Sequence, residues 1–143
     1  MPEVTLTRHI EAPAEEVWAT IADFAAIQRY SPMVAQCTLE GPDGVGQRRR
    51  LILSDGGVTV SRLAAIDPEA RSLTYEILET RLPLADYSST QTVRPIDAKR
   101  CEVTWSSHFQ PRGASEQEAS DFLNAQLDAG LEELRALHER TEG

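Results

Sequence analysis

The sequence predicts an α+β fold in which a seven-stranded antiparallel curved sheet packs against one long C-terminal helix, with two short helices between the first and second strands. Three observations support this fold class. Apolar and polar residues alternate through most of residues 34–110, with turn-forming residues at short intervals. Helical spacing of apolar residues is confined to residues 13–30 and to the region after residue 115. The chain has 143 residues, so we expect residues 1–143 to form a single domain.

The first strand and the two short helices are predicted at the start of the chain. Residues 4–10 alternate between apolar and polar side chains, as in a half-buried strand. Pro13 predicts a helix start, because proline is tolerated at the first helical position, and apolar spacing carries this helix through Phe24. A second short helix is expected from about Ala25 and ends before Ser31, which precedes a proline.

The central part of the chain predicts the remaining strands. Gly, Pro and Asp residues separate the alternating segments by short turns, so neighbouring strands are expected to be antiparallel hairpins. We place these six strands near residues 34–40, 45–53, 57–66, 72–80, 86–95 and 100–110.

The end of the chain predicts a long helix. Ser115 and Glu118 form a capping box, and an apolar stripe continues from Ala119 toward a helix end near Arg140. Gly130 lies inside this helix, where glycine is unfavourable; either close packing against the sheet or room for a ligand would explain it, and we favour close packing. Only this helix is long enough to cover the inner face of the sheet, and a curved sheet leaves a space beneath it for a ligand.

Composition excludes several classes of partner. Fourteen Lys and Arg residues against 23 Asp and Glu residues give a net charge of −9 and an isoelectric point near 4.8, which disfavours nucleic acid and anionic membranes. No apolar stretch is long enough for membrane insertion, and the N-terminus lacks the features of a signal peptide. We therefore expect a cytoplasmic protein that is a monomer or a weak homodimer.

Motifs for metals, cofactors and nucleophilic catalysis are missing from the sequence. The three histidines, His9, His108 and His138, are scattered, and we expect all of them at the surface. Cys37 and Cys101 match no zinc or redox spacing, so both are expected to be reduced and buried, with a structural role. No nucleophile elbow, P-loop or dinucleotide fingerprint occurs, so the sequence predicts no metal and no cofactor.

Strand alternation also predicts which side chains face the space under the helix. If Trp105 points inward, the same phasing turns a sparse polar set inward among apolar neighbours, which is typical of a small-molecule site. The candidate ligand-binding residues are Trp18, Arg49, Leu51, Ser61, Leu63, Tyr75, Ile77, Tyr87, Ser89, Gln91, Trp105, Ser107, Phe122 and Gln126. The alternatives are structural: the tyrosines and tryptophans are core residues, and Arg49 forms an internal salt bridge or is solvated.

Several short sequence motifs, taken together with their order along the chain, resemble those of a known superfamily. They are residues 12–18 (APAEEVW), 23–24 (DF), 30–32 (YSP), 44–46 (GVG) before Arg49, 55–57 (DGG), 73–75 (LTY), 82–84 (LPL) before 86–87 (DY), and 103–105 (VTW). With the element order, they resemble the START-related SRPBCC superfamily, in its polyketide cyclase/dehydrase-like branch, over almost the whole chain. The resemblance implies a helix-grip fold with a hydrophobic cavity between the sheet and the C-terminal helix. Relatives include carriers, ligand sensors and aromatase/cyclases, so it implies no single reaction.

Two positions depart from the family pattern. Relatives often carry Glu where this chain has Ser61, and that Glu would be a partner for an Arg at the position of Arg49. If Arg49 points inward, its charge needs another acceptor, because burying an unpaired guanidinium is costly. Relatives often have Trp at the position of Tyr30, a milder change.

The sequence favours binding or transport of a small hydrophobic molecule, such as a lipid, a polyketide or an aromatic compound. The alternative is a polyketide cyclase or aromatase that catalyses aldol cyclisation and dehydration. In that enzyme Arg49 would steady an enolate oxygen and Tyr75 or Tyr87 would relay a proton. A third hypothesis is a module that docks to a partner protein through an apolar patch. Binding ranks first because no inward-facing His, Asp or Glu is identified as an acid or base.

Overall fold

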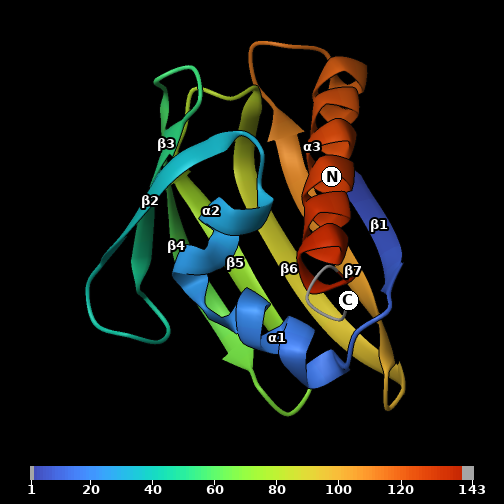
Figure 1. Cartoon of the computed structure of the whole chain (residues 1–143). Helices are drawn as coiled ribbons and strands as arrows, with labels where there is room; N and C mark the ends of the chain where they lie inside the picture. Colours follow the sequence, from blue (N-terminus) through green and yellow to red (C-terminus); the bar gives the residue numbers. More distant parts are fainter. Residues whose placement is uncertain (1, 140–143) are drawn as a thin grey trace.

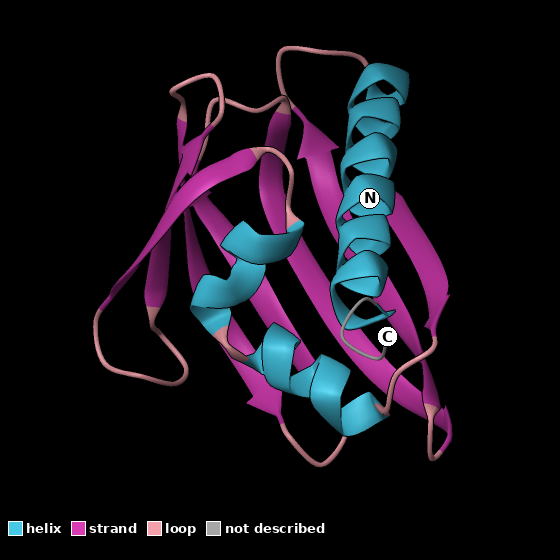
Figure 2. Ribbon diagram, viewed as in Figure 1, coloured by secondary structure: helices cyan, strands magenta, loops and turns pink. Residues whose placement is uncertain are grey.

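Seven strands form one antiparallel sheet that curves around the helices (Figure 1, Figure 2). The structure is a computed structural model that describes residues 2–139. The elements are β1 (Glu3–Ile10), α1 (Ala14–Ala22), the 3-10 turn η1 (Phe24–Ala26), α2 (Ile27–Tyr30), β2 (Val34–Glu40), β3 (Arg48–Leu53), β4 (Val58–Asp67), β5 (Ser72–Glu79), β6 (Leu84–Asp97), β7 (Arg100–Pro111) and α3 (Glu116–Glu139). The strand order is β1-β7-β6-β5-β4-β3-β2, so β1 and β2 are the sheet edges. This architecture confirms the predicted fold class.

The two short helices differ from the prediction in their ends. Pro13 is the N-cap of α1 rather than its first helical residue, with an extended ψ of 142°. The helix ends at Ala22 instead of Phe24, because Asp23 is extended and its carboxylate accepts a hydrogen bond from the backbone N–H of Ala25 at 3.3 Å. The second helix is therefore split into η1 and α2.

Strand positions agree with the prediction apart from some ends. β3 begins at Arg48 rather than 45, because Gly44 and Gly46 adopt positive φ angles of 101° and 97° that belong to a turn. β6 begins and ends two residues beyond the predicted limits, at Leu84 and Asp97, since its long hairpin with β7 continues past them.

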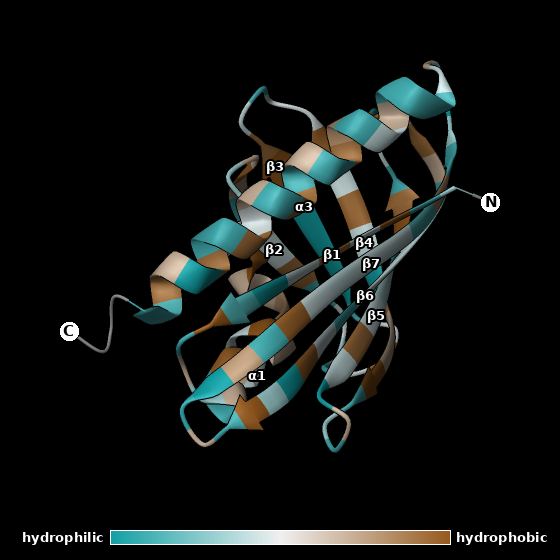
Figure 3. Cartoon of the chain, turned by 90° about the vertical axis from the view of Figure 1, so that its right-hand side faces the viewer, coloured by the Kyte–Doolittle hydropathy of each residue, from teal (hydrophilic) through white to brown (hydrophobic). Residues whose placement is uncertain are grey.

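The predicted inner and outer faces are correct. On β7, Cys101, Val103, Trp105 and Ser107 are buried, whereas the side chains between them are partly or fully exposed. The alternating bands of hydropathy along β7 are visible in Figure 3. The same phasing buries Arg49 on β3, Ser61 on β4, Tyr75 on β5 and Tyr87 on β6. All five central strands therefore turn their inward residues to the face of the sheet that carries the helices (Figure 1).

The long helix α3 starts at the predicted capping box. The backbone N–H of Glu118 donates to Ser115 Oγ at 3.0 Å, and the backbone N–H of Ser115 donates to Glu118 Oε1 at 3.0 Å. The predicted end at Arg140 lies outside the described residues. In the described part of the chain, no helix combines the length and the apolar character needed to cross a membrane.

Gly130 allows α3 to approach the sheet closely. A Cβ atom at this position would lie 2.8 Å from Cζ3 of Trp105. Trp105 has little freedom to move, because its indole N–H donates to Ser89 Oγ at 2.8 Å. Close packing against the sheet, as predicted, explains this glycine.

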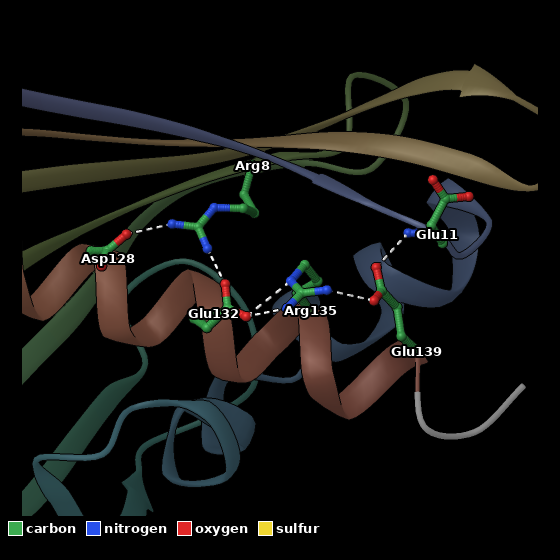
Figure 4. A network of polar contacts seen from close by, with 6 residues as sticks. All are labelled: Arg8, Glu11, Asp128, Glu132, Arg135 and Glu139. Atoms are coloured by element: carbon green, nitrogen blue, oxygen red, sulfur yellow. Dashed lines mark hydrogen bonds and ion pairs between the residues drawn. The ribbon is translucent and has the colours of Figure 1, made fainter. Parts of the chain in front are cut away.

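Ion pairs hold the C-terminal half of α3 against β1. Arg8 on β1 donates to both Asp128 and Glu132 of α3. Figure 4 shows the whole network, which comprises Arg8, Glu11, Asp128, Glu132, Arg135 and Glu139. Linked charges of this kind contribute more than isolated surface pairs, so this end of the helix is firmly attached.

One histidine prediction was wrong. His9 and His108 are exposed as expected, but His138 is only 8% exposed and lies where α3 packs against α1. Its Nε2 forms a hydrogen bond of 2.9 Å with Thr20 Oγ1. Burial lowers the pKa of His138, an effect opposed by Glu16. His138 follows Leu134 by four residues and so extends the apolar stripe by one turn.

The two cysteines are not bridged. Cys37 is half-buried on β2, and Cys101 is buried on β7. Burial raises the pKa of Cys101 to about 11, so its thiol is protonated at neutral pH. The burial expected of both cysteines is found for Cys101, whereas Cys37, on the edge strand β2, is only half-buried.

Candidate functional site

A chamber lies between the inner face of the sheet and the N-terminal half of α3. It is lined by Ile27, Ser31, Met33, Val34, Arg49, Leu51, Thr59, Ser61, Tyr75, Ile77, Leu82, Leu84, Tyr87, Trp105, Phe122, Leu123, Gln126 and Leu127. Its volume is about 60 Å³, and its walls are mainly apolar. Pockets for drug-sized ligands measure roughly 300–1,000 Å³, so a ligand of that size requires the walls to move.

Most of the predicted site residues line this chamber. They are Arg49, Leu51, Ser61, Tyr75, Ile77, Tyr87, Trp105, Phe122 and Gln126. Trp18 and Leu63 instead belong to the surrounding hydrophobic core. Ser89, Gln91 and Ser107 face inward but lie behind the lining, where their side chains bond to Trp105, Tyr30 and Tyr87. Correct strand phasing therefore does not by itself place a residue at the chamber wall.

The sequence analysis missed several lining residues. They are Ile27, Ser31, Met33, Val34, Thr59, Leu82, Leu84, Leu123 and Leu127. Some had a usable signal: Thr59 has the same strand phasing as Ser61, and Leu123 and Leu127 belong to the apolar stripe of α3. The contribution of α2 and of the loop that carries Leu82 could not be found, because strand alternation says nothing about irregular segments.

Arg49 places a buried positive charge at the chamber wall. The residue is 2% exposed, and its Nη1 donates to the backbone oxygen of Phe24 at 3.0 Å. The guanidinium carbon lies 4.0 Å from the ring centroid of Phe24 and 4.6 Å from that of Tyr75. Among the described residues, no carboxylate forms an ion pair with Arg49. Two aromatic faces and one carbonyl therefore replace the Glu that Ser61 does not supply.

Two buried polar atoms near this wall lack hydrogen-bond partners within the described chain. They are Arg49 Nε, a donor, and Gln91 Oε1, an acceptor. Gln91 Nε2 donates to the Tyr30 hydroxyl at 3.3 Å. Burial raises the pKa of Tyr30 to about 12, although nearby Arg49 opposes this, so Tyr30 stays neutral. Unpaired buried donors are costly, and at a chamber wall they favour a polar occupant.

Tyr87 connects the chamber to a row of hydroxyl groups. Its hydroxyl lies 2.9 Å from Ser107 Oγ, which lies 3.0 Å from Ser89 Oγ. Burial, and to a smaller extent neighbouring Tyr75, raises the pKa of Tyr87 well above its ordinary value. The Tyr75 and Tyr87 ring centroids are 6.1 Å apart. Arg49, Tyr75 and Tyr87 thus give the apolar chamber one charged and two phenolic polar groups.

Comparison with known families agrees with this architecture. The family described as "Polyketide cyclase / dehydrase and lipid transport" matches residues 1–139. The chain belongs to this family. The family membership predicted from the sequence motifs is therefore confirmed. This member of the polyketide cyclase/dehydrase family has the helix-grip fold.

Individual relatives of this family member are known proteins of several kinds. Abscisic acid receptor PYL7 of Arabidopsis thaliana is 28% identical over 142 residues, covering 94% of this chain and 67% of the receptor. Protein XoxI of Bacillus cereus superposes with a TM-score of 0.92 at 26% identity, covering 100% of this chain and 99% of that protein. The Zhui aromatase/cyclase of a Streptomyces species superposes with a TM-score of 0.81 at 24% identity, covering 99% of this chain and 96% of the enzyme.

The chemistry available in this chamber is limited. Among the described residues that line it, the titratable side chains are Arg49, Tyr75 and Tyr87, and none is His, Asp or Glu. Arg49 stays charged, and the raised pKa of Tyr87 keeps that phenol protonated at neutral pH. In this member of the family, the lining can donate and accept hydrogen bonds and hold a negative charge, but it offers no efficient base.

The chamber adjoins a pocket at the surface of the protein. Met33, Leu82 and Phe122 line both the chamber and a neighbouring surface pocket beside the β3–β4 turn. Their side chains come from the segment before β2, the β5–β6 loop and α3 respectively. Displacement of these three side chains would join the two spaces, and Met33 is unbranched and adaptable.

Proposed function

We propose that the protein binds a small, largely apolar molecule that carries an acidic group, with the acid against Arg49. The observation that carries this proposal is a buried guanidinium at the wall of an apolar chamber, with no carboxylate partner among the described residues. A cytoplasmic location and a monomeric or weakly dimeric state belong to the same proposal.

The electrostatics of Arg49 favour an anionic ligand. Desolvating a guanidinium costs several kcal/mol, and a carbonyl and two ring faces offset only part of that cost. A ligand carboxylate could accept from the unpaired Nε and supply the missing negative charge. Neutral ligands would leave the charge uncompensated, so acids should be preferred.

Apolar contact would supply the remaining affinity. Burial of apolar ligand surface contributes about 25 cal/mol per Å² before the costs of association are subtracted. The present volume of about 60 Å³ admits only a very small molecule. A larger ligand would enter by displacing Met33, Leu82 and Phe122 toward the adjoining pocket.

Binding is favoured over the alternative of a cyclase. Aldol cyclisation needs a group that removes a proton and one that returns it. Arg49 could hold an enolate oxygen, but burial keeps Tyr87 protonated, and no His, Asp or Glu is among the described lining residues. The same residues therefore support ligand capture better than turnover.

The test combines native mass spectrometry with an Arg49→Met variant. Protein purified under gentle conditions should carry a bound organic acid, which is then identified and titrated beside its methyl ester. We expect the variant to lose at least about tenfold in affinity for the acid and little for the ester. Equal losses for acid and ester would assign Arg49 a structural role. Absence of any bound molecule, together with turnover of an added poly-β-ketone, would favour the cyclase.

A further inference from the structure

We propose that Ser89 and Ser107 fix the Tyr87 hydroxyl as a hydrogen-bond acceptor toward the chamber, so that the preferred ligand carries an O–H or N–H donor there. This inference rests on the proposed function and adds a second recognition point to the acid site at Arg49. It follows from the number of protons that the buried hydroxyl groups can share.

Four side chains form one connected row behind the chamber wall. Trp105 Nε1 donates to Ser89 Oγ at 2.8 Å, and Ser89 Oγ donates to the backbone oxygen of Ser106 at 3.2 Å. Ser89 Oγ also lies 3.0 Å from Ser107 Oγ, which lies 2.9 Å from the Tyr87 hydroxyl. Ser89 and Ser107 are 1% and 0% exposed, so water does not compete for these bonds.

The two ends of the row determine the direction of every bond. An indole N–H can only donate and a carbonyl oxygen can only accept, so the single proton of Ser89 belongs to the Ser106 oxygen. All four contacts can be hydrogen bonds at the same time only if Ser107 donates to Ser89 and Tyr87 donates to Ser107, which is the direction that we propose. In this arrangement each of the contacts is a hydrogen bond. The Tyr87 proton is then used within the row, so toward Tyr75 and the chamber the Tyr87 oxygen can accept a hydrogen bond but has no proton to donate.

Backbone geometry aims Tyr87 at this position. The β6–β7 register shifts between Ala85 and Ser88, as expected of a bulge, and Asp86 within it has a φ of 50°. A bulge of this kind redirects the neighbouring side chain. Tyr87 is 5% exposed and stays protonated because burial raises its pKa, so the proton donated to Ser107 is always present.

The chamber then offers two complementary recognition points. Arg49 presents a donor and a positive charge, whereas Tyr87 presents an acceptor, and the Tyr75 ring lies between them. The ligand class that fits both is a compact apolar acid that also carries a hydroxyl or an N–H group. An acid with only ether or carbonyl oxygens would face the Tyr87 lone pairs without a proton to share.

The experiment uses three of the smallest ring compounds as probes: pyrrole, an N–H donor; cyclopentanone, an acceptor; and furan, a poor partner of either kind. Affinities are measured by NMR titration of the full chain, following the Trp105 indole N–H signal. The variants are Tyr87→Phe, Ser107→Ala and, as the matched control, Ser106→Ala. Ser106 is the outward neighbour on the same strand, and its substitution leaves the backbone oxygen in place.

We expect the unsubstituted protein and the control to bind pyrrole about three- to tenfold more tightly than cyclopentanone. Tyr87→Phe should abolish this preference. Ser107→Ala should reverse it, because the Tyr87 proton is then free to point into the chamber. Equal affinities in the unsubstituted protein, or an unchanged preference in Ser107→Ala, would overturn the inference while leaving ligand binding intact. Failure of all three neutral probes to bind would also overturn this inference, whereas the acid site at Arg49 is tested separately by the titration of acid and ester.

Discussion

Ser61 determines what Arg49 is free to bind. The two residues are directly opposite each other on β3 and β4 and both point into the chamber. Side chains in that relationship have Cβ atoms about 4.5–5.5 Å apart, within reach of an ion pair. A serine here leaves the guanidinium without a partner, which is the property that the proposed acid site requires.

Substitution Ser61→Glu should close the acid site from within. The new carboxylate would pair with Arg49, so affinity for an acidic ligand should fall by at least about tenfold while a neutral ester is little affected. Ser61→Gln has nearly the same size and no charge and should keep the preference for the acid. Calorimetric titration of each of the two variants with the acid and with its ester checks this. Equal losses in the two variants would indicate a steric effect instead.

The absence of a side chain at Gly130 allows α3 to pack closely against Trp105. Alanine improves helix propensity by about 1 kcal/mol, but overpacking costs about 1–3 kcal/mol. Trp105 cannot retreat easily, since it bonds to Ser89 and packs edge-on to Tyr30 with centroids 6.2 Å apart. We expect Gly130→Ala to lower the free energy of unfolding by up to about 2 kcal/mol. The control is Asn124→Ala at an exposed position of α3, which should leave the free energy of unfolding unchanged or raise it. Urea denaturation measures both variants. A Gly130→Ala variant more stable than the unsubstituted protein would contradict the packing argument.

At the scale of elements, regular segments were predictable and irregular ones were not. β6 and β7 each bury one face, so alternation identified their inward residues. The bulge at Asp86 leaves no mark on that alternation, and α2 is too short for helical spacing to define its ends. The chamber walls were therefore predicted along the strands and missed at Ile27 and Leu82. Its small volume depends on how closely α3 packs, which composition does not determine.

The contact between α1 and α3 should make stability depend on pH. His138 meets Thr20 of α1, with Glu16 of α1 favouring its charged form and Arg29 of α2 opposing it. Because burial lowers its pKa, the unfolded chain takes up the proton first as pH falls through about 6.5. Stability should be greatest above that pH, decline below it, and level off beneath the folded-state pKa.

This dependence is checked by urea denaturation between pH 7.5 and 5. The difference between the unsubstituted protein and His138→Gln isolates the contribution of this one group from that of the carboxylates. We expect the difference to shrink or change sign as pH falls. A difference that is constant across the range would show that His138 titrates alike in the folded and unfolded chains.

For the whole molecule, ligand occupancy and folding stability are linked. A ligand that binds only the folded chain stabilises it by about 2.7 kcal/mol at a concentration 100 times its Kd. For a chain of this size, that corresponds to a thermal midpoint about 5–10 °C higher. Protein stripped of its bound molecule by unfolding and refolding should melt earlier by that amount, and adding the extracted molecule should restore the midpoint. Calorimetric scans measure both; identical midpoints would mean that the chamber is empty in the purified protein.

The uneven attachment of α3 has a mechanical consequence. The α3 residues from Asp128 onward are held by ion pairs and by His138, whereas the turns before Asp128 cover the chamber through Phe122, Leu123 and Gln126. The close contact between Gly130 and Trp105 thus lies near the boundary between the part of α3 that ion pairs hold and the part that covers the chamber. A guest larger than the space beneath α3 would displace Phe122 and the helix turn that carries it, so the size of the bound molecule should be readable as a change in the angle of this end of α3 against the sheet.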